Sequence, residues 1–189
     1  MNQLKIISST TRPGRKGVYI ENWITEIAKK EEGFNVELLD LSKIGLPLMD
    51  EPNHPSLQKY EKDHTKKWSA TIAAADAFII VASEYNFSFP APIKNALDYL
   101  FKEWGYKPVA FVSYGGQSGG LRSVQMLKQV VTTLKMVPLT EAVAFPFFEK
   151  TIKENVFTPP EYATPSANAM LKELLRWSEN LKLMRNNPK

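Results

Sequence analysis

The sequence predicts an α/β fold in which a doubly wound, five-stranded parallel sheet lies between two layers of helices. Short apolar and β-branched runs alternate with amphipathic segments along the 189 residues. The runs are too apolar for strands with one solvated face, which indicates parallel strands buried on both faces. No repeat, low-complexity tract or linker interrupts the alternation, so we expect a single domain over residues 1–189.

Five segments have the length and composition of buried strands. Residues 4–8, 36–41, 77–83 and 109–113 are apolar or β-branched at most positions, and residues 139–145 form a fifth, weaker candidate. The carboxyl ends of such strands meet at one edge of the sheet, where ligands bind at the point of reversed winding. We therefore expect the site in the loops that follow these ends.

Amphipathic segments predict the helices between and after the strands. Apolar residues recur at helical spacing in segments 20–28, 121–134 and 170–181. Gly33 is expected to close the first helix in the left-handed conformation. The first half of segment 56–75 is polar, and we expect it to be solvated or loop-like.

The composition, with 43% apolar and 23% charged residues, is that of a soluble globular protein, and we expect it to be cytoplasmic for the two reasons that follow. Cysteine is absent, which excludes disulfides, thiolate metal sites and cysteine nucleophiles, and fits a reducing compartment. The longest apolar run, residues 77–82, is far shorter than the roughly 20 residues of a membrane helix, and the amino terminus lacks the pattern of a secretory signal. The formal charge of +4 lies in mixed-sign segments, which favours anionic small molecules over nucleic acid as ligands.

The first loop, residues 9–17, brings three hydroxyls and three cations to the start of an amphipathic helix. A helix amino terminus carries partial positive charge and unpaired N–H donors, and arginine adds a planar fork of donors, so a phosphate suits this loop. Its glycines match neither the dinucleotide nor the nucleoside triphosphate pattern, which favours a monophosphate. The alternative is a polar, solvated turn.

Two further loops have the composition of a site for a flat ring. In residues 83–92, aromatic rings alternate with polar groups, as a heteroaromatic ring with a hydrogen-bonding edge requires; aromatic packing under a loop is the alternative. Residues 113–122 hold four of the nine glycines, whose bare backbone permits close approach to a ligand, although a flexible turn has the same composition. Together at one sheet edge, the three loops indicate a site.

These residues resemble the NADPH-dependent FMN reductase family, whose members include quinone, azo-dye and chromate reductases. The resemblance spans residues 4–145 and is carried by residues 9–15, by the Glu84-Tyr85-Asn86 motif within residues 83–98, and by the glycine loop 115–122. Ser83 stands where the family usually has proline. The resemblance implies a flavodoxin-like fold, an FMN cofactor, and NADPH or NADH as electron donor.

The resemblance also assigns roles to residues. It implies that Ser9, Arg12 and Arg15 hold the FMN phosphate, and that the later loops border the isoalloxazine ring. The full set of candidate FMN-binding residues is Ser9, Thr11, Arg12, Arg15, Gly17, Val18, Glu84, Tyr85, Asn86, Phe87, Ser88, Ser113, Tyr114, Gly115 and Gly116. Because the flavin carries the chemistry, no side chain is expected to act as acid, base or nucleophile. His54 and His64 are expected to be solvated rather than to bind metal, and Asp98 to cap or pair structurally.

The predicted function is an NAD(P)H-dependent reductase that passes electrons through FMN to a small acceptor: FMN itself, a quinone, an azo compound or a metal oxyanion. By the resemblance, it forms a homodimer or homotetramer, and residues 46–51 lie near the pocket and the subunit contact. Nucleic acid and membrane partners are not expected. Two alternatives remain, namely a flavodoxin-type electron carrier, disfavoured by the +4 charge, and a non-flavin phosphosugar or nucleotide binder.

Overall fold

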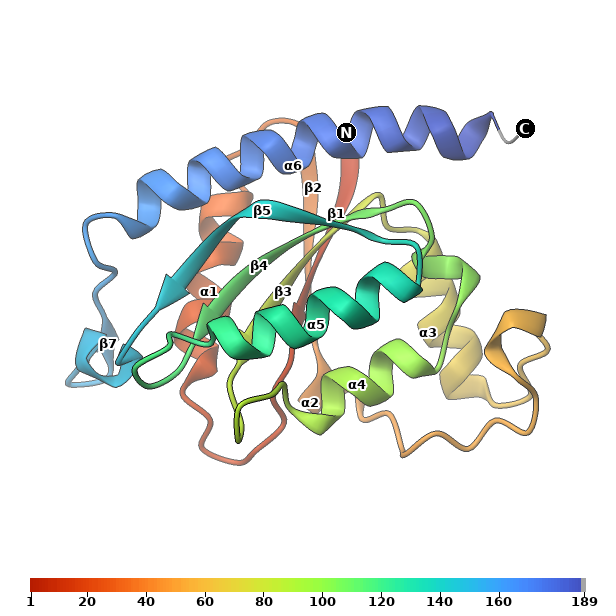
Figure 1. Cartoon of the computed structure of the whole chain (residues 1–189), viewed down its shortest axis with the longest axis horizontal. Helices are drawn as coiled ribbons and strands as arrows, with labels where there is room; N and C mark the ends of the chain where they lie inside the picture. Colours follow the sequence, from red (N-terminus) through yellow and green to blue (C-terminus); the bar gives the residue numbers. More distant parts are fainter. Residues whose placement is uncertain (188–189) are drawn as a thin grey trace.

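The computed structural model describes residues 1–187 and contains a five-stranded parallel sheet with the strand order β2-β1-β3-β4-β5 (Figure 1). The strands are β1 (Asn2–Ser8), β2 (Phe34–Asp40), β3 (Ala77–Ser83), β4 (Pro108–Tyr114) and β5 (Val137–Phe145). The predicted doubly wound sheet is confirmed, and so is its weaker fifth strand. The winding reverses between β1 and β3, which makes their carboxyl ends the place for a ligand.

The sheet is buried on both faces because its side chains alternate between two apolar cores. Ile6 and Ile79 point into one core, while Ile7, Phe78 and Ile80 point into the other. All seven residues of the central strand β3 are buried. This explains why the strands read in the sequence as continuous apolar runs.

Helices cover both faces (Figure 1). Side chains of α1 (Gly17–Ala28) and α6 (Ala163–Asn186) fill the core on one face, and those of α3 (Asp63–Ala73), α4 (Ala91–Asp98) and α5 (Leu121–Thr133) fill the core on the other. Short elements connect them: α2 (Leu41–Ile44), η1 (Pro55–Leu57), η2 (Lys102–Trp104) and η3 (Phe148–Thr151). Within residues 1–187, no helix has the length and apolar character needed to cross a membrane.

Gly33 does not close α1, and that prediction is wrong. The helix ends at Ala28, and Gly33 is not among the residues with positive φ. A Cβ at Gly33 would lie 2.3 Å from Cδ2 of Leu175 on α6. The glycine is therefore required by close packing between the start of β2 and the last helix.

A small hairpin, β6 (Ile152–Lys153) and β7 (Val156–Phe157), joins β5 to α6 and was not predicted. Phe157 packs edge-on against Trp23 of α1 and Phe145 of β5, with ring centroids 6.2 and 5.7 Å apart. These contacts hold the hairpin against the middle of α1 and the end of β5. Figure 1 shows it at the end of the molecule where the loops after β4 and β5 lie.

Leu174→Ala should destabilise the whole protein, because Leu174 is fully buried where α6 packs on the sheet. We expect the free energy of unfolding in urea to fall by about 2–5 kcal/mol. Leu183→Ala, on the same helix but 63% exposed, should change it by less than about 0.5 kcal/mol. Equal effects of the two changes would show that α6 is not part of the core.

Candidate functional site

The three predicted loops meet in a cleft of about 410 Å³ at the carboxyl ends of β1, β3 and β4. The volume lies within the range of small-molecule sites. The predicted residues that line this cleft are Arg12, Arg15, Glu84, Tyr85, Tyr114, Gly115 and Gly116. The structure thus brings together residues that are more than 100 positions apart in the sequence.

Other predicted residues lie beside or beneath the cleft. Thr11 lines a neighbouring hollow of about 320 Å³, and Asn86, Phe87 and Ser88 line a shallow groove next to α5. Gly17 and Val18 form the first turn of α1. Ser9 and Ser113 are buried: the Ser9 hydroxyl accepts a 3.3 Å bond from the Ser83 N–H, and the Ser113 hydroxyl donates a 2.8 Å bond to the Gly119 carbonyl.

The first loop presents cations at a helix amino terminus. The Arg15 N–H bonds to the Arg12 carbonyl at 3.1 Å, and Gly14 adopts a positive φ of 69°, which turns the chain into α1. The first N–H groups of a helix have no partner within it, and they carry the positive end of its dipole. Arg12 is exposed, and the Lys16 side chain is half-exposed at the mouth of the cleft.

Gly17 lets α1 cross closely over the end of β4. A Cβ at Gly17 would lie 2.1 Å from the hydroxyl oxygen of Tyr114. The Tyr114 ring is buried, packs edge-on against Phe148 at a centroid distance of 4.7 Å, and brings its hydroxyl within 3.4 Å of Thr10 Oγ1. Burial raises the pKa of Tyr114, so its hydroxyl stays protonated.

Two carboxylates lie beneath the first loop and share the guanidinium of Arg15. Its Nη2 atom is 2.7 Å from Asp40 Oδ2 at the end of β2 and 3.8 Å from Glu21 Oε2 on α1. Burial raises the pKa of Glu21, and the Ser8 bond and the Arg15 charge only partly oppose this. Burial also opposes ionisation of Asp40, but the bonds from Ser42 and Arg15 outweigh it and lower the Asp40 pKa.

Glu84 connects the second loop to the third. Its carboxylate accepts a 2.5 Å bond from the Ser118 hydroxyl and a 2.6 Å bond from Arg122 Nε, and it pairs with Arg122 Nη2 at 2.5 Å. Burial opposes ionisation of Glu84, but these bonds outweigh it and lower its pKa. The Arg122 guanidinium also lies 3.8 Å from the centroid of the Phe87 ring. Glu84 therefore fixes the two loops relative to each other.

The second loop reverses direction in a tight turn. The backbones of Tyr85 and Ser88 exchange two hydrogen bonds of 2.8 and 2.9 Å, and the two residues between them, Asn86 and Phe87, have φ of 50° and 69°. Positive φ at both central positions is typical of hairpin turns whose first residue is asparagine. The turn presents the Tyr85 ring to the cleft.

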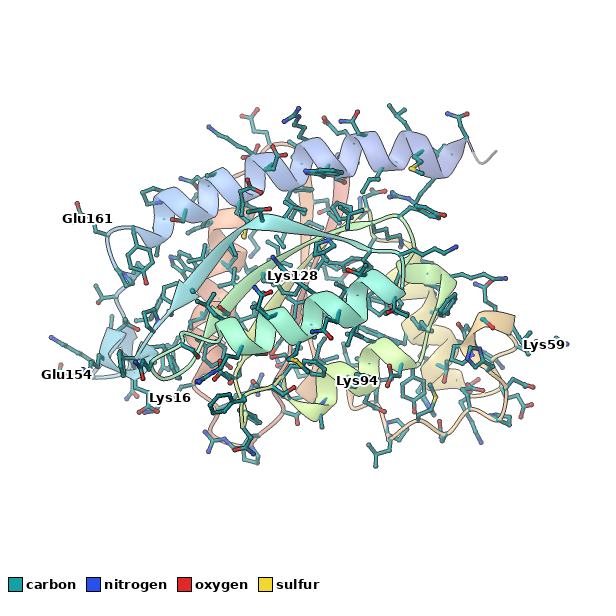
Figure 2. The ribbon with its side chains drawn as sticks, in the orientation of Figure 1. Lys16, Lys59, Lys94, Lys128, Glu154 and Glu161 are labelled. Atoms are coloured by element: carbon teal, nitrogen blue, oxygen red, sulfur yellow. The ribbon has the colours of Figure 1, made fainter. Side chains whose placement is uncertain are left out.

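Residues 147–150 form a further wall of the cleft that the sequence analysis missed. The N–H of Phe147 bonds to the Gly116 carbonyl at 2.8 Å, and that of Phe148 to the Gly115 carbonyl at 3.3 Å, so this segment continues alongside the third loop. Glu149 pairs with Lys16 across the mouth at 3.5 Å. Figure 2 shows Lys16 at the same end of the molecule as Glu154 of the β6–β7 turn.

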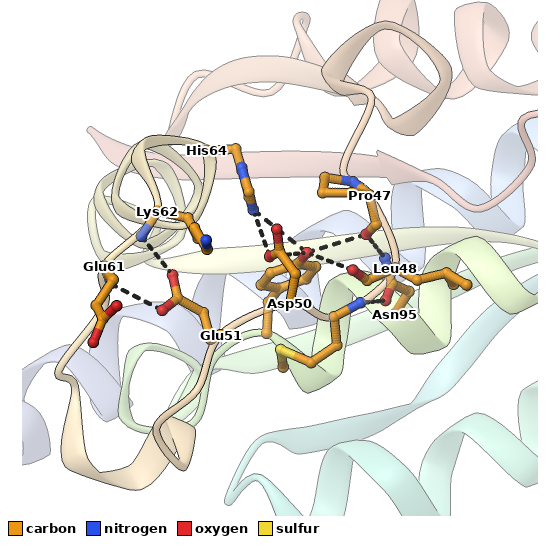
Figure 3. A network of polar contacts seen from close by, with 10 residues as sticks. Pro47, Leu48, Asp50, Glu51, Glu61, Lys62, His64 and Asn95 are labelled. Carbon is orange, nitrogen blue, oxygen red and sulfur yellow. Dashed lines mark hydrogen bonds and ion pairs between the residues drawn. The ribbon is translucent and has the colours of Figure 1, made fainter.

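A polar network holds residues 46–51 against α3 and α4 (Figure 3). The side chain of Asn95 bonds to Pro47 and Met49, at 2.6 and 3.0 Å. Asp50 accepts a 3.0 Å bond from the buried Tyr99 hydroxyl. Burial, with a contribution from Asp50, raises the pKa of Tyr99 to about 12.

His64 belongs to the same network, so its expected solvation is only partly right. Its side chain is one-third exposed, and its Nε2 atom lies 2.9 Å from Asp50 Oδ1. His54 is exposed and accepts the N–H of Ser56, while Asp98 pairs with Lys94 on the surface. Across residues 1–187, no group of three or more His, Cys, Asp or Glu side chains is placed to hold a metal.

The residues of the cleft fit FMN. Arg12 and Lys16 supply charge for a phosphate beside the first turn of α1. Beneath them, the buried Nε of Arg15 has no hydrogen-bond partner within the described residues, which leaves a donor unused. Flat surfaces for a ring system come from the Tyr85 and Phe147 side chains and from the bare backbone of Gly116, which belong to the same lining.

A family model described as NADPH-dependent FMN reductase matches residues 3–150. The chain belongs to this family. Apart from Asn2, the match includes all five strands of the parallel sheet, with the three loops and the wall at 147–150, and it ends before α6. This match confirms the family resemblance that the sequences of the three loops had indicated.

Relatives of this FMN reductase family member have matching names. It is 40% identical over 148 residues to an NAD(P)H-dependent FMN reductase of Schizosaccharomyces pombe, covering 76% of this chain and 74% of that protein. It is 35% identical over 101 residues to an NADPH:quinone oxidoreductase of Arabidopsis thaliana, covering 52% of this chain and 50% of that protein. Among solved structures, the FerB flavoenzyme NAD(P)H:(acceptor) oxidoreductase of Paracoccus denitrificans superposes with a TM-score of 0.73 at 19% identity, covering 95% and 98% of the chains.

Family membership confirms three predictions from the sequence: the oxidoreductase class, FMN as cofactor, and NAD(P)H as donor. The flavodoxin-like fold is confirmed by the sheet topology and by the FerB structure. The two alternatives, an electron carrier and a non-flavin binder, are not favoured. The roles of individual site residues stay predictions.

Gly17→Ala should destabilise the fold, because its Cβ would overlap the Tyr114 hydroxyl. We expect the free energy of unfolding in urea to fall by about 1–3 kcal/mol, as for other overpacked sites. Combining it with Tyr114→Phe should restore part of this loss, since the Tyr114 hydroxyl oxygen is the nearest atom to the added Cβ. An unchanged stability of Gly17→Ala would contradict the close crossing of α1 over β4.

Proposed function

We propose that this NAD(P)H-dependent flavoprotein reductase passes electrons from NADPH or NADH to a small acceptor, a quinone or a free flavin in the first place, with azo compounds and metal oxyanions as further candidates. The observation that supports the proposal is a cleft whose lining combines cations, Arg12 and Lys16, with aromatic and glycine residues, among them Tyr85 and Gly116. The names of the relatives, which are FMN reductases and quinone oxidoreductases, support the same acceptor class.

In this proposal the protein binds and orients the cofactor. Arg12, Lys16 and the first N–H groups of α1 hold the phosphate, with Thr11, Gly17 and Val18 shaping the loop. Tyr85, Gly115 and Gly116 border the ring, while the Asn86–Ser88 part of the turn and Tyr114 support these walls. The buried hydroxyls of Ser9 and Ser113 fix the strand ends from beneath.

FMN supplies, when bound, the ring that accepts hydride and releases electrons. The chain's own contribution is to keep one side of the cleft closed by packed side chains and the other side accessible to exchangeable partners. Tyr85 and Phe147 are partly exposed at this rim. Donor and acceptor therefore use the same opening in turn, and the protons that the reduction consumes come from solvent rather than from a protein side chain.

We further propose that the protein is a cytoplasmic homodimer or homotetramer whose 189 residues act as a single domain, without nucleic acid or membrane partners. Leu48, which is 82% exposed, and the partly exposed Met49 and Ile44 form an apolar surface on segment 44–49. The bonds from Asn95 and Tyr99 hold this segment in one conformation, as a subunit contact requires. Packing of α6 on both β4 and β5 supports a single domain.

Anaerobic spectroscopy tests the reductase. The protein should take up FMN and become yellow, and either NADPH or NADH should bleach it at a rate sufficient for turnover. A quinone should then restore the colour. Bound FMN that neither nucleotide reduces would contradict the proposal and favour an electron carrier.

Arg12→Ala should weaken FMN binding far more than Lys16→Ala, because the Arg12 guanidinium has no hydrogen-bond or ion-pair partner within residues 1–187, whereas Lys16 is paired with Glu149. We expect the dissociation constant for FMN, measured by flavin fluorescence, to rise by about 10-fold to 100-fold in Arg12→Ala. The dissociation constant for riboflavin, which lacks the phosphate, should not change. Equal effects of the two substitutions, or an equal loss of riboflavin, would contradict the placement of the phosphate.

A further inference from the structure

Glu21 is an unusual residue to find beneath a loop built for an anion. It lies on the second turn of α1 and is 1% exposed. One hydroxyl bonds to it, from Ser8 to Oε1 at 2.5 Å, while its other oxygen lies 3.8 Å from Arg15 Nη2. Because helical side chains point toward the amino terminus, the carboxyl group lies under the same helix end that the phosphate would use.

The charges around Glu21 do not balance it. Arg15 donates from the same Nη2 atom to Asp40 at the shorter distance of 2.7 Å, so one guanidinium serves two carboxylates. Lys43 on α2 adds a more distant positive charge, and Tyr114 of β4 faces Glu21 with a neutral hydroxyl. Asp40 adds a negative charge, which opposes ionisation of Glu21.

A phosphate on this loop would bring further negative charge to the same place. Two anions that share one site cannot both stay charged at low cost, and the group with the weaker set of partners takes up a proton. Asp40 has the stronger set, because Arg15 and Ser42 both bond to it. Glu21, which accepts a bond from one hydroxyl, has the weaker set of partners.

We propose that Glu21 is a positioning residue of the FMN phosphate loop, which takes up one proton from solvent when the loop binds the phosphate, while Asp40 keeps Arg15 in place beneath it. This inference rests on the proposed placement of the phosphate on residues 9–17. Protonated Glu21 no longer repels the phosphate, and Arg15, which lies 3.8 Å from Glu21 Oε2, stays bonded to Asp40. The charge of the loop is thus adjusted by one proton rather than by movement of the backbone.

The sign of the pH dependence separates Glu21 from the phosphate itself. Uptake of a proton by Glu21 makes FMN affinity fall as pH rises through the interval between its pKa in the free and in the bound protein. The second ionisation of a phosphate, with a pKa of about 6, acts in the opposite direction, because cations bind the dianion better. Above about pH 7 the phosphate is a dianion in both states, and the effect of Glu21 remains.

Calorimetry in buffers with different ionisation enthalpies tests the proposal at about pH 7, where the phosphate is already largely a dianion. FMN binding to the apoprotein should take up more protons in the wild type than in Glu21→Gln, by up to one proton per site. Riboflavin should show no such difference. Glu26→Gln, an exposed carboxylate on the same helix, is the matched control and should behave as the wild type. Equal proton uptake with FMN in the wild type and Glu21→Gln would overturn the proposal.

A second measurement needs only the wild type, in case Glu21→Gln does not fold. The ratio of the riboflavin to the FMN dissociation constant should fall with rising pH between about pH 7 and 8.5, by up to about tenfold per pH unit. A ratio above one that does not change with pH would overturn the role of Glu21 and leave the phosphate site intact. A ratio of one throughout would instead show that the phosphate does not bind to this loop.

Discussion

The parallel pairing of β1, β3 and β4 is the constraint on which the site depends. Strand β3 is buried along its whole length and hydrogen-bonds to β1 on one side and to β4 on the other. Because all three run in the same direction, their carboxyl ends reach one edge, and the winding reverses there. The first, second and third loops, which follow these strands, therefore all begin at this edge. The cleft is a consequence of sheet topology before any of its side chains is considered.

The loops are held in place by bonds among themselves. Glu84 connects the second loop to Ser118 and Arg122 of the third, and Phe147 and Phe148 bond to the backbone of Gly116 and Gly115. These contacts are formed within the chain itself and restrict how far the loops can move relative to one another. Preorganisation of this kind lowers the cost of binding, because side chains and loops lose little further freedom.

The sequence predicted the strands and helices that are determined by patterns among neighbouring residues. Buried strands such as residues 77–83 and the amphipathic pattern of residues 170–181 are visible in the residue order alone, and the structure confirms both. The loops were found because their composition changes where each strand ends. The resemblance then supplied the ligand, which the charge and hydroxyl pattern of the first loop had left as a monophosphate.

The features that were missed depend on contacts between distant segments. Gly33 looked like a helix end, but its lack of a side chain is explained by Leu175, more than 140 residues later. Residues 147–150 carry no motif, although their position after β5 places them at the same sheet edge as the third loop. Glu21 occupied an ordinary polar position within an amphipathic helix. Only the packing of α1 over β1 shows that its carboxyl group is buried.

That buried carboxyl group follows from the strand register as directly as the cleft does. Ser8 and Asp40 are paired residues at the ends of β1 and β2, so both side chains lie on the sheet face that α1 covers. Glu21, one helical turn from the start of α1, accepts a hydrogen bond from Ser8 of this pair. From the loop above, Arg15 bonds to Asp40 and lies near Glu21. A shift of one residue between β1 and β2 would turn Asp40 to the opposite face and leave Arg15 without its closest carboxylate. The register of an edge strand therefore determines how much charge lies beneath the phosphate loop, and with it how the loop responds to pH.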